Sequence, residues 1–93
     1  MFVKLYKVQS TDEGKFYLSE VRLNVSHILF ISENTDLNRR HANGEIDTGL
    51  SPMAKFSDIL VATRTSSEKI TVVGEPELIE TKINTSNKQL LKG

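Results

Sequence analysis

The stretch Asp58-Ile-Leu-Val-Ala-Thr-Arg64, together with the residues that follow it, decides the fold. Its middle is apolar and mostly β-branched, which is typical of a strand. Thr65-Ser-Ser-Glu68 then supplies turn-forming side chains, and Lys69-Ile-Thr-Val-Val73 resumes the strand pattern. The two runs predict a β-hairpin, although its turn lacks the Asn-Gly or Asp-Gly pair that favours such turns most strongly.

A helix is predicted after this hairpin. Gly74-Glu-Pro76 ends the second strand because proline cannot donate a ladder hydrogen bond, and proline fits the first turn of a helix. Four apolar residues then fall near one helical face, and three acidic residues stand at the end that the helix dipole favours. The apolar residues are Leu78, Ile79, Ile83 and Leu90, and the acidic residues are Glu75, Glu77 and Glu80.

The end of this helix is less regular. Asn84-Thr-Ser-Asn87 places residues that prefer caps and turns in the helix interior, which favours an end or a break there. We therefore expect residues 88–93 to form a frayed tail.

The N-terminal part of the chain predicts a first hairpin. Residues 2–9 alternate, so that Val3 and Leu5 share one face while Phe2, Tyr6 and Val8 lie mostly on the other. Residues 10–14 form a polar connection, and residues 15–23 return as a second strand. Within this strand the apolar phase changes partway, which indicates either a β-bulge near Ser19-Glu20 or a break between two strands.

A third strand is predicted over residues 27–32. Its centre, Ile28-Leu-Phe-Ile31, is apolar at both parities, which indicates a central strand covered on both faces. The C-terminal helix is the expected cover for one of them.

Residues 33–49 differ from the rest of the chain because only three of these seventeen residues are apolar. We predict a long polar loop, within which Asn43-Gly44 is a type I′ turn signal for a small hairpin. A loop of this length in a compact domain is either a binding loop or disordered.

These elements predict one domain, residues 1–93, of the β-rich α+β class. We expect about five mostly antiparallel strands in a curled sheet or small partly open barrel, with one C-terminal helix.

The composition excludes several classes of protein. Twelve basic residues balance twelve acidic ones, so no global field attracts nucleic acid or an anionic membrane. The chain has no cysteine, which excludes disulfides, thiolate zinc sites and thiol nucleophiles. The start of the chain alternates apolar and polar residues, unlike a signal peptide, and the longest apolar run is too short to span a bilayer. We therefore expect a cytoplasmic protein with no membrane partner.

The sequence contains no recognisable catalytic or metal-binding pattern. There is no nucleophile elbow, phosphate loop or dinucleotide fingerprint, and neither His27 nor His41 has a ligand partner at a recognisable spacing. We predict that the protein is not an enzyme and uses no cofactor or metal.

Two kinds of binding remain. Small sheets have edges that pair with a strand of another protein or of an identical subunit, so the favoured function is an interaction or regulatory module that self-associates or binds a second protein. The alternative is a β module that binds single-stranded nucleic acid. It would use Arg39, Arg40, His41 and Arg64, with stacking on Tyr6, Phe16 or Tyr17.

The order of elements resembles the small β domains of the flagellar FlbD type. The resemblance lies in Val3-Lys-Leu5, in Leu23-Asn-Val-Ser-His-Ile28, and in the passage Thr71-Val-Val-Gly-Glu-Pro-Glu-Leu-Ile-Glu80 from hairpin to acidic helix. Residues 33–49 are extra relative to that pattern. The resemblance implies a similar fold and assigns no functional residue. The chain also looks similar to many small phage and bacterial proteins.

Overall fold

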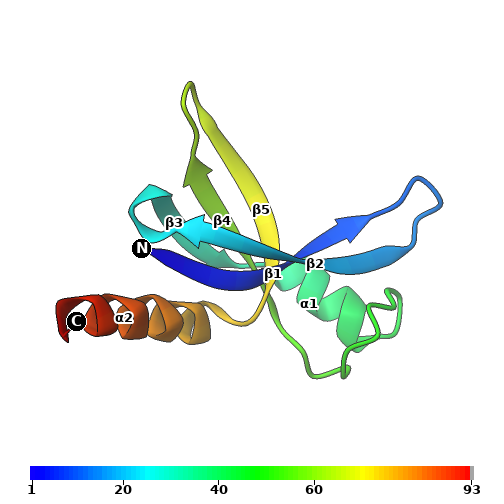
Figure 1. The fold of residues 1–93 in the computed structure, drawn as a ribbon. Helices are drawn as coiled ribbons and strands as arrows, with labels where there is room; N and C mark the ends of the chain where they lie inside the picture. The colour runs from blue at the N-terminus through cyan, green and yellow to red at the C-terminus, as the bar shows by residue number, and fades with distance from the viewer. Residues whose placement is uncertain (93) are drawn as a thin grey trace.

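Five strands form one antiparallel sheet in the computed structural model, which describes the backbone of residues 1–92 and the side chains of residues 1–85 (Figure 1). The spatial order is β2-β1-β5-β4-β3, so β2 and β3 are the two edges and the sheet is not closed. The elements are β1 (Phe2–Ser10), β2 (Phe16–Asn24), the 3₁₀ helix η1 (Val25–His27), β3 (Ile28–Glu33), α1 (Thr35–Ala42), β4 (Phe56–Ala62), β5 (Ser67–Val73) and α2 (Pro76–Lys92).

The two predicted hairpins are confirmed, and they form two arms of the sheet. β1 pairs with β2 over its whole length, and β4 pairs with β5 from Phe56↔Val73 to Ala62↔Ser67. Between the arms, β1 and β5 form a ladder pair at Lys7 and Val72. In Figure 1 the β1–β2 arm runs across the view while the β4–β5 arm rises from it. The sheet is therefore sharply bent where the arms meet.

The main core lies on the inner side of this bend. Ile59 and Ile70 face each other across β4 and β5, and Val72 follows on the same face of β5. From the other arm, β1 contributes Val3 and Leu5. All five side chains are buried, so the burial of apolar surface from both arms holds the bend together.

Helix α2 covers this core, as the sequence predicts. It begins at Pro76 and contacts β1 and β3, with Ile79 buried and Ile83 packed beside it. The helix continues through Asn84–Asn87, so the predicted break is wrong. Each of these residues lowers helix stability by less than about 1 kcal/mol, and none is the proline that would force a stop. The predicted place of Leu90 on the apolar face and the fraying of residues 88–93 concern side chains outside the described ones.

The predicted bulge in β2 is also wrong, because the register with β1 is unbroken from Phe2↔Asn24 to Ser10↔Phe16. The change of apolar phase has another cause. Val21 packs against the main core, whereas Leu18, three residues earlier, is half-buried on the opposite face of the hairpin beside Val8. The two ends of the hairpin therefore bury opposite faces.

Strand β3 is an edge strand, which corrects the prediction of a central strand covered on both faces. The register with β4 shifts between Ile28 and Phe30, so a bulge lies at Leu29. Because of this bulge, Ile28 and Ile31 both pack against the core while Leu29 and Phe30 are exposed. The apolar run thus reflects a bulged edge strand and not burial on two faces.

The segment 33–49 contains a second helix, α1, where the sequence predicts a polar loop. The N-cap is Asn34, whose side chain accepts a hydrogen bond from the Leu37 N–H (2.9 Å). Asn43, with φ −83° and ψ 0°, caps the other end, and Gly44 follows at φ +77°. Asn43-Gly44 therefore ends a helix, and the predicted type I′ hairpin is absent from this part of the described chain.

Polar contacts attach α1 to the sheet. The side-chain oxygen of Asn38, a buried residue, accepts a hydrogen bond from the Phe56 N–H (2.6 Å), and its amide nitrogen donates to Glu33 (3.1 Å). The His41 ring meets Phe56 edge-on, with 5.0 Å between centroids, and its Nε2 lies 2.7 Å from the Thr48 hydroxyl. Because this buried face is largely polar, α1 lacks the apolar stripe by which helices are predicted.

Replacing Asn38 with alanine should lower the free energy of unfolding by about 1–3 kcal/mol, because the buried Phe56 N–H loses its acceptor. Urea denaturation followed by circular dichroism measures the change. Asn43→Ala is the matched control on the exposed end of the same helix and should have a smaller effect. Equal losses for the two variants would contradict the buried role of Asn38.

Candidate interaction surfaces

The structure places the predicted arginines of α1 at the surface but neutralises part of their charge. Arg39 lies 2.7 Å from the Asp36 carboxylate and Arg40 lies 3.9 Å from the same group. His41 is only 4 % exposed, and its ring contacts Phe56 and Thr48. Of the three neighbouring residues predicted to bind, two share one carboxylate and the third is internal.

Arg64 lies far from these arginines. It occupies the β4–β5 turn, which the Thr63 N–H closes onto the Ser66 carbonyl oxygen (2.9 Å). β4 begins beside α1, where the Asn34 N–H donates to the Phe56 carbonyl oxygen (3.0 Å). The strand between them spans about 20 Å at 3.3 Å per residue. Figure 1 accordingly shows the hairpin tip and α1 at opposite ends of the molecule, so the predicted residues do not form one site.

The predicted aromatic residues are also separated. Tyr6 lies opposite Glu20 in the ladder, whereas Tyr17 lies opposite Gln9, and the alternation of the strands puts the two rings on opposite faces of the hairpin. Phe16 is half-buried. Tyr17 therefore shares no stacking surface with Tyr6, and Phe16 is partly covered.

The described residues offer neither a metal site nor a helical membrane span. Within this part of the chain, no group of three or more histidine or acidic side chains converges as metal ligands would. No helix within residues 1–92 is both long and apolar enough to cross a membrane.

An apolar patch lies on the edge strand β3. Leu29 is 56 % exposed and Phe30 is 51 % exposed, and Phe30 lies opposite the half-buried Leu60 of β4. We call these three residues the β3 patch. From Ile28 to Ser32 the strand has no charged residue. The apolar run Ile28-Leu-Phe-Ile31 is visible in the sequence, but only the bulge in β3 shows which two of its residues face outward.

The other edge strand, β2, presents charges instead. Glu20 lies 3.7 Å from Lys4 of β1 and 3.7 Å from Arg22 of its own strand. Charged side chains on an edge oppose pairing with another chain. Of the two edges, β3 is therefore the one that favours contact with a protein.

Comparison of the chain with protein-family models, with curated proteins and with solved structures finds no match. The FlbD-type resemblance stays a prediction, and function is inferred from the surfaces of this molecule.

Proposed function

We propose that the protein is a non-enzymatic interaction module that binds another protein, or a second copy of itself, through the β3 patch. The observation that carries this proposal is the exposure of Leu29 and Phe30 on an edge strand that has no charged residue from Ile28 to Ser32. A partner that covers them removes two large apolar side chains from water.

The size of this gain indicates what kind of complex the patch supports. Completing the burial of a half-exposed leucine and phenylalanine is worth about 1.5–3 kcal/mol in total, taking half the value for full burial. Stable complexes bury about 800 Å² on each partner, so residues around the patch must also contribute. The β3 patch is thus expected to be the energetic centre of a larger contact.

The bulge restricts how a partner binds. The register shift between Ile28 and Phe30 interrupts the regular spacing of backbone groups along the edge. A long added strand would leave part of its backbone unpaired at this point. We therefore expect side-chain contacts with Leu29 and Phe30 to dominate, with a short ladder at most beyond Phe30.

Replacing Phe30 with lysine should abolish this binding, because a partner would then bury an ammonium group without a counter-charge. Wild-type protein and the variant are immobilised, and the proteins retained from a cell extract, including added copies of this chain, are identified by mass spectrometry. Tyr17→Lys is the matched control, since it makes the same kind of change at an exposed aromatic residue of the other edge strand.

The proposal predicts at least one protein that wild type and Tyr17→Lys retain and Phe30→Lys does not. Sedimentation of the purified chain shows whether that protein is a second copy. If the three baits retain the same proteins in the same amounts, the β3 patch is not the binding surface and the proposal is wrong.

A further inference from the structure

A second surface, distinct from the β3 patch, lies on the outer face of β1. Val3 and Leu5 point into the core, so the alternation of the strand turns Phe2, Lys4 and Tyr6 outward. Phe2 is 61 % exposed and Tyr6 is 42 % exposed. Four residues at 3.3 Å each separate the two aromatic residues by about 13 Å, with Lys4 midway.

The charges around these aromatic residues are mostly positive. Arg22 of β2 is the ladder partner of Lys4, and both cations lie 3.7 Å from the one carboxylate of Glu20. The three side chains therefore sum to one positive charge.

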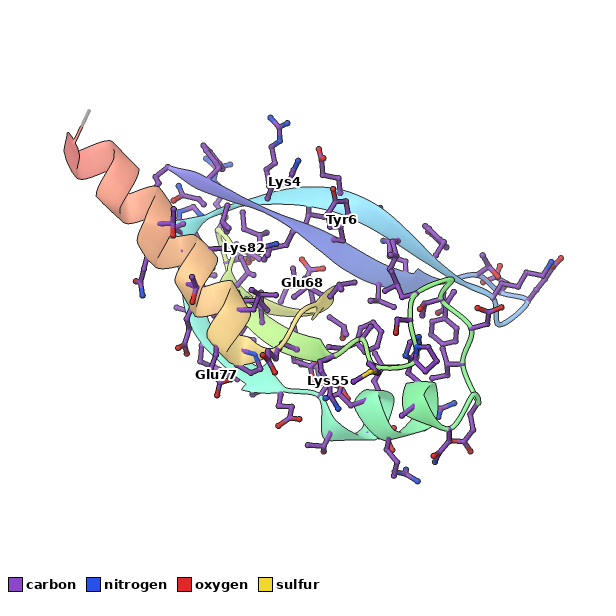
Figure 2. All side chains as sticks on the ribbon, turned by 90° about the horizontal axis from the view of Figure 1, so that it is seen from below. Lys4, Tyr6, Lys55, Glu68, Glu77 and Lys82 are labelled. Carbon is purple, nitrogen blue, oxygen red and sulfur yellow. The ribbon has the colours of Figure 1, made fainter. Side chains whose placement is uncertain are left out.

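Helix α2 places one further cation, Lys82, beside β1. Lys82 and Lys4 line one groove of about 340 Å³ between the two elements, together with Val3, Thr81 and Thr85. Figure 2 shows Lys4 and Tyr6 on β1 and Lys82 on the neighbouring helix. Lys4, Arg22 and Lys82 therefore carry three positive charges against the one carboxylate of Glu20, although the chain as a whole is neutral.

We propose that these residues bind single-stranded nucleic acid, with bases stacked on Phe2 and Tyr6 and phosphates held by Lys4, Arg22 and Lys82. We call this surface the β1–α2 platform. Exposed aromatic side chains interleaved with cations suit a strand whose unpaired bases offer π-faces and whose backbone is anionic. A duplex would offer no free base face to the aromatic rings, because its bases are stacked on one another.

The same charges disfavour an apolar protein partner on this surface. Such a partner would bury Lys4 and Arg22 away from water with Glu20 as their only counter-charge, which costs several kcal/mol per unpaired ion. A polyanion supplies the missing counter-charges.

Fluorescence anisotropy of the full chain with a labelled oligothymidylate of about 12 nucleotides tests the proposal, since a single-strand module covers 4–16 nucleotides. The plot of log affinity against log salt should have a slope of about −2 for three phosphate contacts. Tyr6→Ala should weaken binding by about fivefold or more, the lower limit for the loss of one base stack. Tyr17→Ala removes an equally exposed tyrosine from the opposite face and should leave the affinity unchanged.

The phosphate contacts are tested separately. Lys4→Gln combined with Lys82→Gln should make the salt slope shallower by about 1.4, whereas Arg39→Gln combined with Arg40→Gln should leave it unchanged. Circular dichroism establishes that each variant is folded. Phe30→Lys should bind the oligonucleotide as wild type does, so this result is separable from that for the β3 patch.

Three results would each overturn the proposal. The first is no binding at about 20 mM salt, where phosphate contacts are strongest. The second is an affinity for a sugar-phosphate chain without bases that equals the affinity for the oligothymidylate, and the third is loss of binding in the Arg39–Arg40 variant alone. The second result would indicate a site for anions in general, and the third would indicate that nucleic acid binds at α1.

Discussion

Phe56→Ala is expected to lower the free energy of unfolding by about 3–5 kcal/mol, the usual cost of removing a buried phenylalanine. Phe56 is 0 % exposed, contacts the His41 ring and begins the strand to which α1 is attached. A chain of this size has a total stability of about 5–10 kcal/mol, so the variant should lose at least about a third of it. Chemical denaturation of both proteins measures the difference.

The control is Phe30→Ala, which makes the same substitution on β3. Because Phe30 is half exposed at the edge of the sheet, this variant should lose less than about 1.5 kcal/mol. If Phe30→Ala proves as destabilising as Phe56→Ala, then β3 is not an edge strand.

Ile79→Ala is expected to cost about 2–5 kcal/mol, because the cavity it leaves lies between α2 and both arms of the sheet. Ile79 is 1 % exposed. Thermal denaturation should show a lower midpoint in a single transition, since the helix covers the core and does not fold separately from it.

Leu78→Ala is the control for α2, one residue earlier on the same helix. Leu78 is 49 % exposed, so the Leu78→Ala variant should lose much less stability than the Ile79→Ala variant. Both substitutions raise the helix propensity of the residue, so propensity does not explain a difference between them. Equal losses in the two variants would mean that α2 docks on the sheet by a different face.

The elements that the sequence predicts are those specified by neighbouring residues. Both hairpins follow from alternating strand residues joined by short polar turns, and Gly14 at φ +83° supplies the special conformation in the first turn. Pro76 marks the start of α2 because its effects on the backbone are local. None of these predictions required knowledge of which strands become neighbours.

Two features could not be predicted in this way. The position of β3 at an edge depends on the order of all five strands, and the bulge at Leu29 depends on its register with β4. The local signals for α1 were present in Asn34 and Gly44, but its attachment through Asn38 and His41 gave no apolar periodicity.

The residues proposed to bind nucleic acid also divide into those placed by local sequence and those placed by the packing of distant elements. The alternation of β1 places Phe2 and Tyr6 on one face, which the sequence predicts. The pairing of Arg39 and Arg40 with Asp36 depends on the helix that brings them within reach, and the position of Lys82 beside Lys4 depends on the docking of α2. The arginines predicted to bind nucleic acid therefore lie on other elements than the β1–α2 platform that we propose.

The central claim is that β3 is an exposed edge, and thiol labelling of single-cysteine variants tests it most directly because the chain has no cysteine of its own. Phe30→Cys is compared with Ser57→Cys, which exchanges a hydroxyl for a thiol at a residue that is 0 % exposed on the adjacent strand. At low protein concentration, Cys at position 30 should react within about tenfold of the rate in the unfolded chain, and Cys at position 57 at least about a thousandfold more slowly. Equal protection at the two positions would place β3 inside the sheet and remove the surface on which the proposed function depends.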